Sequence, residues 1–217
     1  MTTTTTPTTR PALERRRFVS PELVDLRTAW TLERDLATAP DARHDAWCQG
    51  RHGWMLEDGL DTVLEPVLRQ DTYGAQAFYR FFDLDGAAAE TLLDRLDPGY
   101  LAEERQNDGP SIGAVLRALA AHPDRLRAHG YVVGPGRCDE RITVEGVLVR
   151  TDDELVVDRH HSRSCQCEHL VRYVAEDLGI DDMRVPPHEV GPWWGFSFNA
   201  PADEGEDEER WYRLWWD

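Results

Sequence analysis

Hydrophobic and polar positions follow two different periods along the chain, and the change comes after Pro123. Before it, apolar residues recur at helical intervals in segments 20–40, 41–75, 85–96 and 111–123. After it, short β-rich runs dominate, at residues 131–133, 141–150 and 154–158. This order predicts an α+β fold, a single body with N-terminal helices and a mainly antiparallel C-terminal sheet.

Local signals mark several ends of these elements. Ser20 and Ser111 are good helix N-caps, with Pro21 suited to the first turn after Ser20. The stretch AFYRFF predicts a short strand before the helix at 85–96. The turn residues at 97–99 then predict a loop over residues 99–110.

The C-terminal third predicts a sheet with one more helix. In the run 141–150, apolar residues alternate, as in a half-buried antiparallel strand. A helix is predicted over 165–178, with Gly179 just after its end, and an irregular connection over 181–192. The chain closes with a predicted hairpin around the acidic loop 203–209. Its strands alternate aromatic and apolar residues: Trp194, Phe196 and Phe198 on the first, and Tyr212, Leu214 and Trp216 on the second.

The sequence predicts two parts of unequal size. Residues 1–19 are rich in threonine and end in a basic cluster, so they bury too little apolar surface to offset the entropy of ordering. We expect a disordered arm there and a single α+β domain over residues 20–217.

Charge and composition restrict the partners that we expect. The net charge is −17, which disfavours nucleic acid and anionic membranes and favours a basic protein partner. All 24 basic residues are arginine, a bias typical of a GC-rich bacterial genome. No long apolar run or secretory signal is evident, so we expect a cytoplasmic protein whose four cysteines are thiols or metal ligands.

One stretch, DRHHSRSCQCEHLVRYVAEDLG, concentrates metal-ligand chemistry. It places His160, His161, Cys165, Cys167 and His169 within ten positions. Zinc binds four nitrogen or sulfur ligands in a tetrahedron, and a C-x-C segment before a helix can wrap such an ion. Zinc is therefore the one cofactor that the sequence suggests, in a structural or a hydrolytic site. The alternative is no cofactor, because cysteines are often small buried hydrophobic residues.

Other patterns leave alternatives open. His44, Cys48 and His52 form a second histidine–cysteine cluster at helical spacing. In the first stretch, Cys165 is a candidate nucleophile near a helix start, with His160 or His161 as its base and Asp158 to orient that base. Such sets usually come from distant segments, and we expect no catalytic role.

Residues 116–144 follow the order of a winged helix: a helix, a basic turn and a hairpin. A recognition helix with polar, base-reading residues is not evident, and the protein is acidic. A small DNA-binding regulator is therefore the second alternative function.

Aromatic residues gather at the C-terminus. Five of the eight tryptophans lie there: Trp193, Trp194, Trp211, Trp215 and Trp216. Adjacent residues of a strand point to opposite faces, so some of these rings are expected outside the core. Trp193, Trp215 and Arg213 are thus our candidate partner-binding residues. The function that we expect first is a non-catalytic, protein-binding or accessory role.

Overall fold

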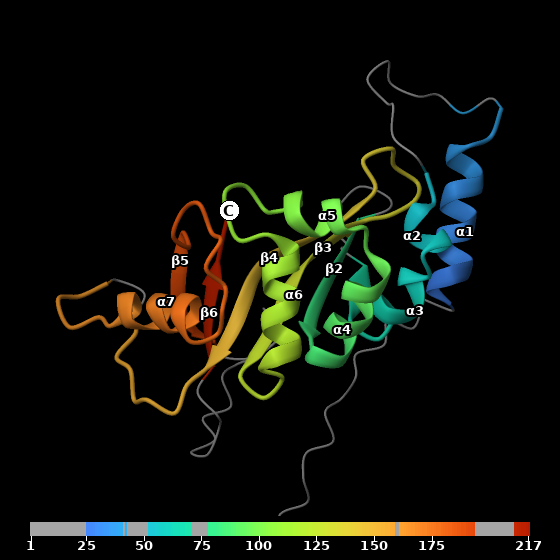
Figure 1. The fold of residues 1–217 in the computed structure, drawn as a ribbon. Helices are drawn as coiled ribbons and strands as arrows, with labels where there is room; N and C mark the ends of the chain where they lie inside the picture. Colours follow the sequence, from blue (N-terminus) through green and yellow to red (C-terminus); the bar gives the residue numbers. More distant parts are fainter. Residues whose placement is uncertain (1–24, 41, 43–51, 71–77, 159–160, 194–210) are drawn as a thin grey trace, which may run out of the picture.

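The computed structural model describes residues 25–40, 42, 52–70, 78–158, 161–193 and 211–217. These residues form helices and a six-stranded antiparallel sheet with the strand order β1-β2-β3-β4-β6-β5, which confirms the α+β class (Figure 1). In chain order, the elements are α1 (Leu26–Ala37), α2 (Trp54–Glu57), α3 (Leu60–Leu64), β1 (Leu68–Gln70), β2 (Phe78–Leu84), α4 (Gly86–Arg95), α5 (Pro98–Glu103), α6 (Ile112–Ala121), β3 (Leu126–Val133), β4 (Arg141–Arg150), α7 (Cys167–Glu176), β5 (Glu189–Trp193) and β6 (Trp211–Trp215).

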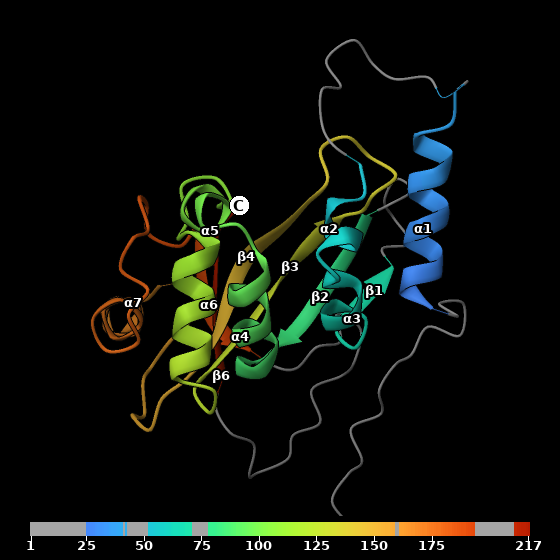
Figure 2. The ribbon, with the colours of Figure 1, turned by 45° about the vertical axis from the view of Figure 1, so that its right-hand side comes forward.

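The helices form a layer on one side of the sheet. Helices α4 and α6 lie over its middle, α7 over the β5–β6 end and α1 to α3 toward the β1–β2 end (Figures 1 and 2). A single cluster of buried residues runs between the layers, from Leu26 and Trp30 of α1 to Leu214 and Trp216 near the C-terminus. None of the described helices is both long enough and apolar enough to cross a bilayer.

Capping explains where the sequence-based boundaries succeed. The Ser111 side chain accepts a hydrogen bond from the Ala114 N–H at 3.1 Å, so α6 begins where predicted. Asp85 accepts from the Ala88 N–H at 2.9 Å and starts α4 in the same way. The bounds of β4 are also confirmed, and the predicted aromatic strand is present as β2.

Two N-terminal predictions are wrong in their boundaries. Asp25 is extended, with φ −175°, and its side chain accepts from the Arg27 N–H, so α1 begins at Leu26 rather than beside Ser20. Ser20 itself lies outside the described residues. The expected helical segment 41–75 contains two short helices and strand β1, because the left-handed Gly59 (φ +70°) separates α2 from α3.

Three further predictions need correction. The expected loop at 99–110 contains α5, because Asp97 caps the N–H groups of Gly99 and Tyr100, and Pro98 occupies the first turn. Strand β3 begins at Leu126, and residues 154–158 are not in a strand. The irregular connection ends in strand β5, which pairs with β6. The arm at 1–19, the first predicted hairpin strand and the acidic loop lie outside the described residues.

Strand β4 is buried on both faces, so the prediction of a half-buried strand is wrong. Every residue from Ile142 to Val149 is buried. The helices cover one face. On the other face, side chains of neighbouring strands cover the backbone, and Leu148 there retains only 1% exposure.

Gly146 permits close contact in this central strand. It pairs with His129 of β3 on one side and with Trp215 of β6 on the other. A Cβ atom at this position would lie 2.5 Å from the His129 Nε2 atom and 2.5 Å from the Leu214 carbonyl oxygen. The glycine therefore makes room for the imidazole and for the β6 backbone together.

We predict that Gly146→Ala lowers the free energy of unfolding by about 1–3 kcal/mol, because the added methyl group overpacks a buried site. The measurement is urea denaturation, with amide hydrogen exchange of β6 as a local readout. Gly99→Ala is the matched control, since Gly99 is exposed and its nearest atom is a side-chain oxygen of Asp97. Equal stability and equal β6 protection in both variants would contradict the packing role.

Candidate functional site

Reciprocal hydrogen bonds close the loop before α7. The Gln166 N–H donates to the Val156 carbonyl oxygen at 2.7 Å, and the Val156 N–H donates to the Gln166 side-chain oxygen at 2.8 Å. Within the loop, the Asp158 carboxylate accepts from the Ser162 N–H at 3.2 Å and from the Ser162 hydroxyl at 2.6 Å. These bonds hold Val156 beside Gln166 and Asp158 beside Ser162, and so bring the two ends of the loop together.

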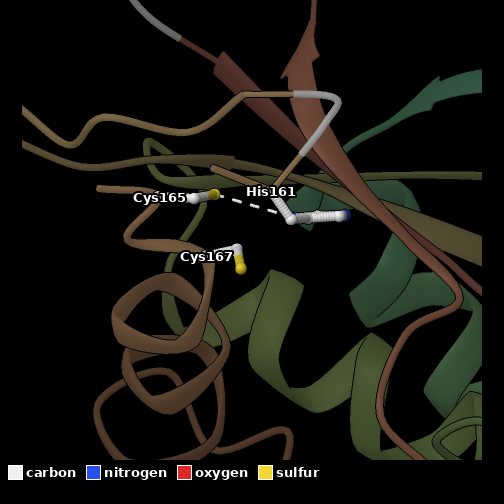
Figure 3. Close-up of side chains that lie close together, drawn as sticks. All are labelled: His161, Cys165 and Cys167. Atoms are coloured by element: carbon white, nitrogen blue, oxygen red, sulfur yellow. Dashed lines mark hydrogen bonds between the residues drawn. The ribbon is translucent and has the colours of Figure 1, made fainter. Parts of the chain in front are cut away.

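The closed loop places three metal-ligand side chains side by side (Figure 3). His161 has a left-handed backbone, with φ +46°, an uncommon conformation for a residue other than glycine. Its Nδ1 atom lies 3.6 Å from the Cys165 Sγ atom. Cys167 is the first residue of α7. The three ligand atoms of His161, Cys165 and Cys167 all lie within 4.8 Å of one another.

These separations can be compared with those around a zinc ion. Zn–S bonds near 2.3 Å and Zn–N bonds near 2.0 Å in a tetrahedron put sulfur and nitrogen about 3.6 Å apart and two sulfurs about 3.8 Å apart. The observed distance from Cys165 to His161 is 3.6 Å. The group is partly exposed, with His161 exposed and both cysteines half-buried. An ion can therefore enter from solvent with small side-chain movements.

The two cysteines differ in acidity. Partial burial, taken by itself, acts to raise the pKa of both thiols. At Cys165, hydrogen bonds with the Asp158 backbone and His161 outweigh burial, and its pKa is lowered. The pKa of Cys167 is raised by burial and by the neighbouring Cys165 sulfur. Cys165 is therefore the thiol that ionises first.

The other predicted ligands do not join this group. His169 is exposed on α7 and is not among the three clustered residues. His160 lies outside the described residues, as do His44 and Cys48. His52 lies in another part of the fold, where its Nδ1 atom is 2.9 Å from the Pro135 carbonyl oxygen.

The structure bears on two further expectations for this chemistry. The nucleophile–base distance from Cys165 to His161 is short, but the carboxylate expected to orient the base, that of Asp158, accepts hydrogen bonds from Ser162.

Cys138 is disulfide-bonded, so the expectation that all four cysteines are thiols or ligands is wrong at this residue. Cys165 and Cys167 are free.

An open cavity of about 440 Å³ adjoins the cluster. Its walls come from the loop before α7, from α7 and from the segment that leads into β5: His161, Cys167, Glu168, Val171, Arg172, Ala175, Pro186, Pro187, His188 and Val190. Sequence reasoning missed it because its walls meet only in the folded chain. The Pro186–Pro187 pair next to His188 is a visible signal, but nothing in the sequence places it against α7.

The predicted partner-binding residues lie together on the sheet face opposite the helices. The Arg213 guanidinium carbon is 5.9 Å from the Trp193 ring centre and 5.1 Å from the Trp215 ring centre. These distances are within reach of cation–π attraction. All three side chains are half-buried. Arg127 approaches Trp211 in the same way, at 5.8 Å.

His129 lies at the centre of this face, and sequence reasoning did not single it out. Its ring is parallel to that of Trp193, with centres 6.3 Å apart, and its Nε2 atom accepts a hydrogen bond from Arg213 Nε at 3.2 Å. Glu145 pairs with Arg80 at 2.7 Å on the same face. Burial, together with the charges of Arg213 and Arg80, lowers the pKa of His129 to about 3. The imidazole is therefore neutral near pH 7.

The region with winged-helix order takes a different place in the fold. Seven of the ten residues of α6 are buried against its neighbours. The hairpin β3–β4 forms the middle of the six-stranded sheet. Helix α6 therefore presents little surface that could enter a groove of DNA.

We predict that His129 makes stability fall in mild acid. Between pH 6.5 and 3 the unfolded imidazole binds a proton that the folded one does not, so the free energy of unfolding decreases as the pH falls through this window. Relative to pH 7.5, the loss at pH 5.0 is about 2 kcal/mol. The His129→Gln variant should not show this pH-dependent loss of unfolding free energy in chemical denaturation, because glutamine keeps an acceptor for Arg213 but does not titrate. Parallel pH profiles for the two proteins would refute the assignment.

Comparisons of the chain with family models, curated proteins and solved structures find no match in any of the three.

Proposed function

We propose that the protein binds Zn²⁺ through His161, Cys165 and Cys167. The observation that carries this proposal is the spacing of three ligand atoms within 4.8 Å, with 3.6 Å between Cys165 Sγ and His161 Nδ1. Two thiolates and an imidazole favour zinc and other borderline or soft ions over magnesium and calcium, which prefer oxygen ligands. The reciprocal bonds of Val156 and Gln166 hold the ligands in place before an ion arrives.

The ligand count supports an open site rather than a closed structural one. Among the described residues, no fourth histidine, cysteine or carboxylate belongs to the group. Two cysteines and one histidine are one of the ligand sets of catalytic zinc sites, in which water or substrate takes the fourth position. Bound zinc would lower the pKa of that water or polarise a substrate oxygen. The chain's own contribution is to hold the ion at the edge of an apolar cavity.

We predict that reduced, metal-free protein binds one equivalent of Zn²⁺ in a calorimetric titration and one of Co²⁺, with a thiolate-to-cobalt absorption band. Cys165→Ser and Cys167→Ser each remove a direct ligand of the ion. Loss of a group that only hydrogen-bonds to a ligand weakens metal binding roughly 10–100-fold, so each of these variants should weaken zinc binding by more than that.

His169→Ala is the matched control for these variants, since His169 lies close in sequence but outside the cluster. It should bind zinc as the wild type does. A folded, reduced wild type that binds no zinc would overturn the proposal, and so would a His169→Ala variant impaired as strongly as the cysteine variants. Far-ultraviolet circular dichroism verifies folding in each case.

As a second candidate, we infer that the face bearing Trp193, Arg213 and Trp215 docks a protein. Its support is the Arg213 side chain beside two half-buried indole rings, since tryptophan and arginine dominate the energetics of protein interfaces. The net charge of −17 favours a partner that is basic overall, which long-range attraction would bring to the acidic protein.

We predict that Trp215→Ala weakens binding of such a partner at least tenfold, as expected for the loss of a hot-spot side chain. Candidates are captured from a bacterial lysate and are then purified and titrated directly against wild type and variant. Leu36→Ala is the control, because Leu36 is an exposed apolar residue on α1. Equal affinities of wild type and Trp215→Ala for every purified candidate would exclude this use of the face.

A further inference from the structure

We propose that the cavity beside α7 binds a small amphipathic molecule whose oxygen head group takes the open zinc position and whose apolar body fills the cavity. This inference rests on the zinc function proposed above, and it names the class of ligand for that site.

The zinc ligands and the cavity share a wall. His161 and Cys167 belong to the three-residue metal cluster, and both line the cavity. An ion held by these side chains therefore borders the cavity. The volume of about 440 Å³ falls within the roughly 300–1,000 Å³ of small-molecule sites.

The walls away from the metal are apolar and fixed. They are formed by aliphatic and proline side chains from α7 and the segment before β5: Val171, Ala175, Pro186, Pro187 and Val190. The two prolines restrict their own backbone. His188, next to them, donates its N–H to the Trp215 carbonyl oxygen at 2.8 Å, which ties this wall to β6. Such a preformed apolar site favours a ligand with a hydrocarbon body.

Polar groups on the same cavity suit an oxygen head group. The Nδ1 atom of His188 accepts from the Asp217 N–H at 3.2 Å, so in the neutral ring the proton lies on Nε2, which can donate. Arg172 lines the cavity, is exposed, and makes no hydrogen bond or ion pair with any other described residue. Glu168, one turn earlier on α7, is the one carboxylate among the lining residues. Because the lining surface is almost wholly apolar, a bound metal ion would be the main attachment point for an oxygen head group.

The probes are octanohydroxamate and acetohydroxamate, which carry the same zinc-binding head group on a long and a short apolar body. Co²⁺-loaded protein reports binding through a change in its visible spectrum. We expect octanohydroxamate to bind at least about 100-fold more tightly than acetohydroxamate, because its six additional methylene groups can be buried in the cavity. Zn²⁺-loaded protein in calorimetry should give the same ranking.

Ala175→Trp tests the cavity itself, because the larger side chain fills it and leaves the three metal ligands unchanged. We expect this variant to take up Co²⁺ as the wild type does and to bind the two probes within a factor of three of each other. Glu176→Trp is the matched control: Glu176 is the next residue of α7, is exposed and does not line the cavity. It should keep the preference for the long probe.

The outcomes separate the two proposals. Normal Co²⁺ uptake with equal affinities for the two probes in the wild type overturns the ligand inference and leaves the zinc function standing. A long-probe preference that survives in Ala175→Trp also overturns it, because the apolar body would then lie elsewhere. Absence of Co²⁺ and Zn²⁺ uptake overturns the zinc function, and this inference with it.

Discussion

The pairing of β6 with β4 is the interaction on which both candidate sites depend. Residues 211–215 pair with residues 146–150, and within the described part of the chain β5 pairs only with β6. This pairing requires Gly146, since a side chain there would meet the Leu214 carbonyl oxygen. Once β6 is in place, its backbone holds His188 at the cavity wall, and its side chains carry Arg213 and Trp215 to the opposite face. One backbone contact thus positions parts of both sites.

The face opposite the helices shows how a central strand can be buried without a second helical layer. The side chain of His129 on the neighbouring strand β3 lies against Gly146 of β4, and polar atoms on this face satisfy one another: Arg213 donates to His129, and Arg80 pairs with Glu145. Burial costs are limited for these four side chains because each is paired with another. The chain has no lysine, and the cation on this face is therefore an arginine. Its planar guanidinium can lie near indole rings and donate to an imidazole at the same time.

Sequence reasoning predicted elements whose signals are local. The caps Asp85 and Ser111 and the β-rich run 141–150 set boundaries that the fold keeps. It failed where one signal has two meanings, as at 97–99, where Asp-Pro-Gly starts helix α5 rather than a loop. At the histidine–cysteine cluster, spacing pointed to the stretch that holds it but could not separate His161 from His169, because the choice depends on a left-handed residue and a loop closed by Gln166.

The cavity was beyond sequence reasoning because one of its walls leads into strand β5, which carries Pro192 and no strong alternation. On the aromatic face, the sequence pointed to Trp193, Arg213 and Trp215 but not to their contact with His129. Val190 lines the cavity on the helix side, whereas Trp193, three residues later, stacks beside His129 on the other face. A five-residue edge strand therefore separates the two candidate sites. Since β5 is paired only through β6, a ligand that shifts Val190 would act on a strand whose far side holds the Trp193–Arg213 contact. The two proposed binding sites are thus physically adjacent and lie on opposite faces of β5.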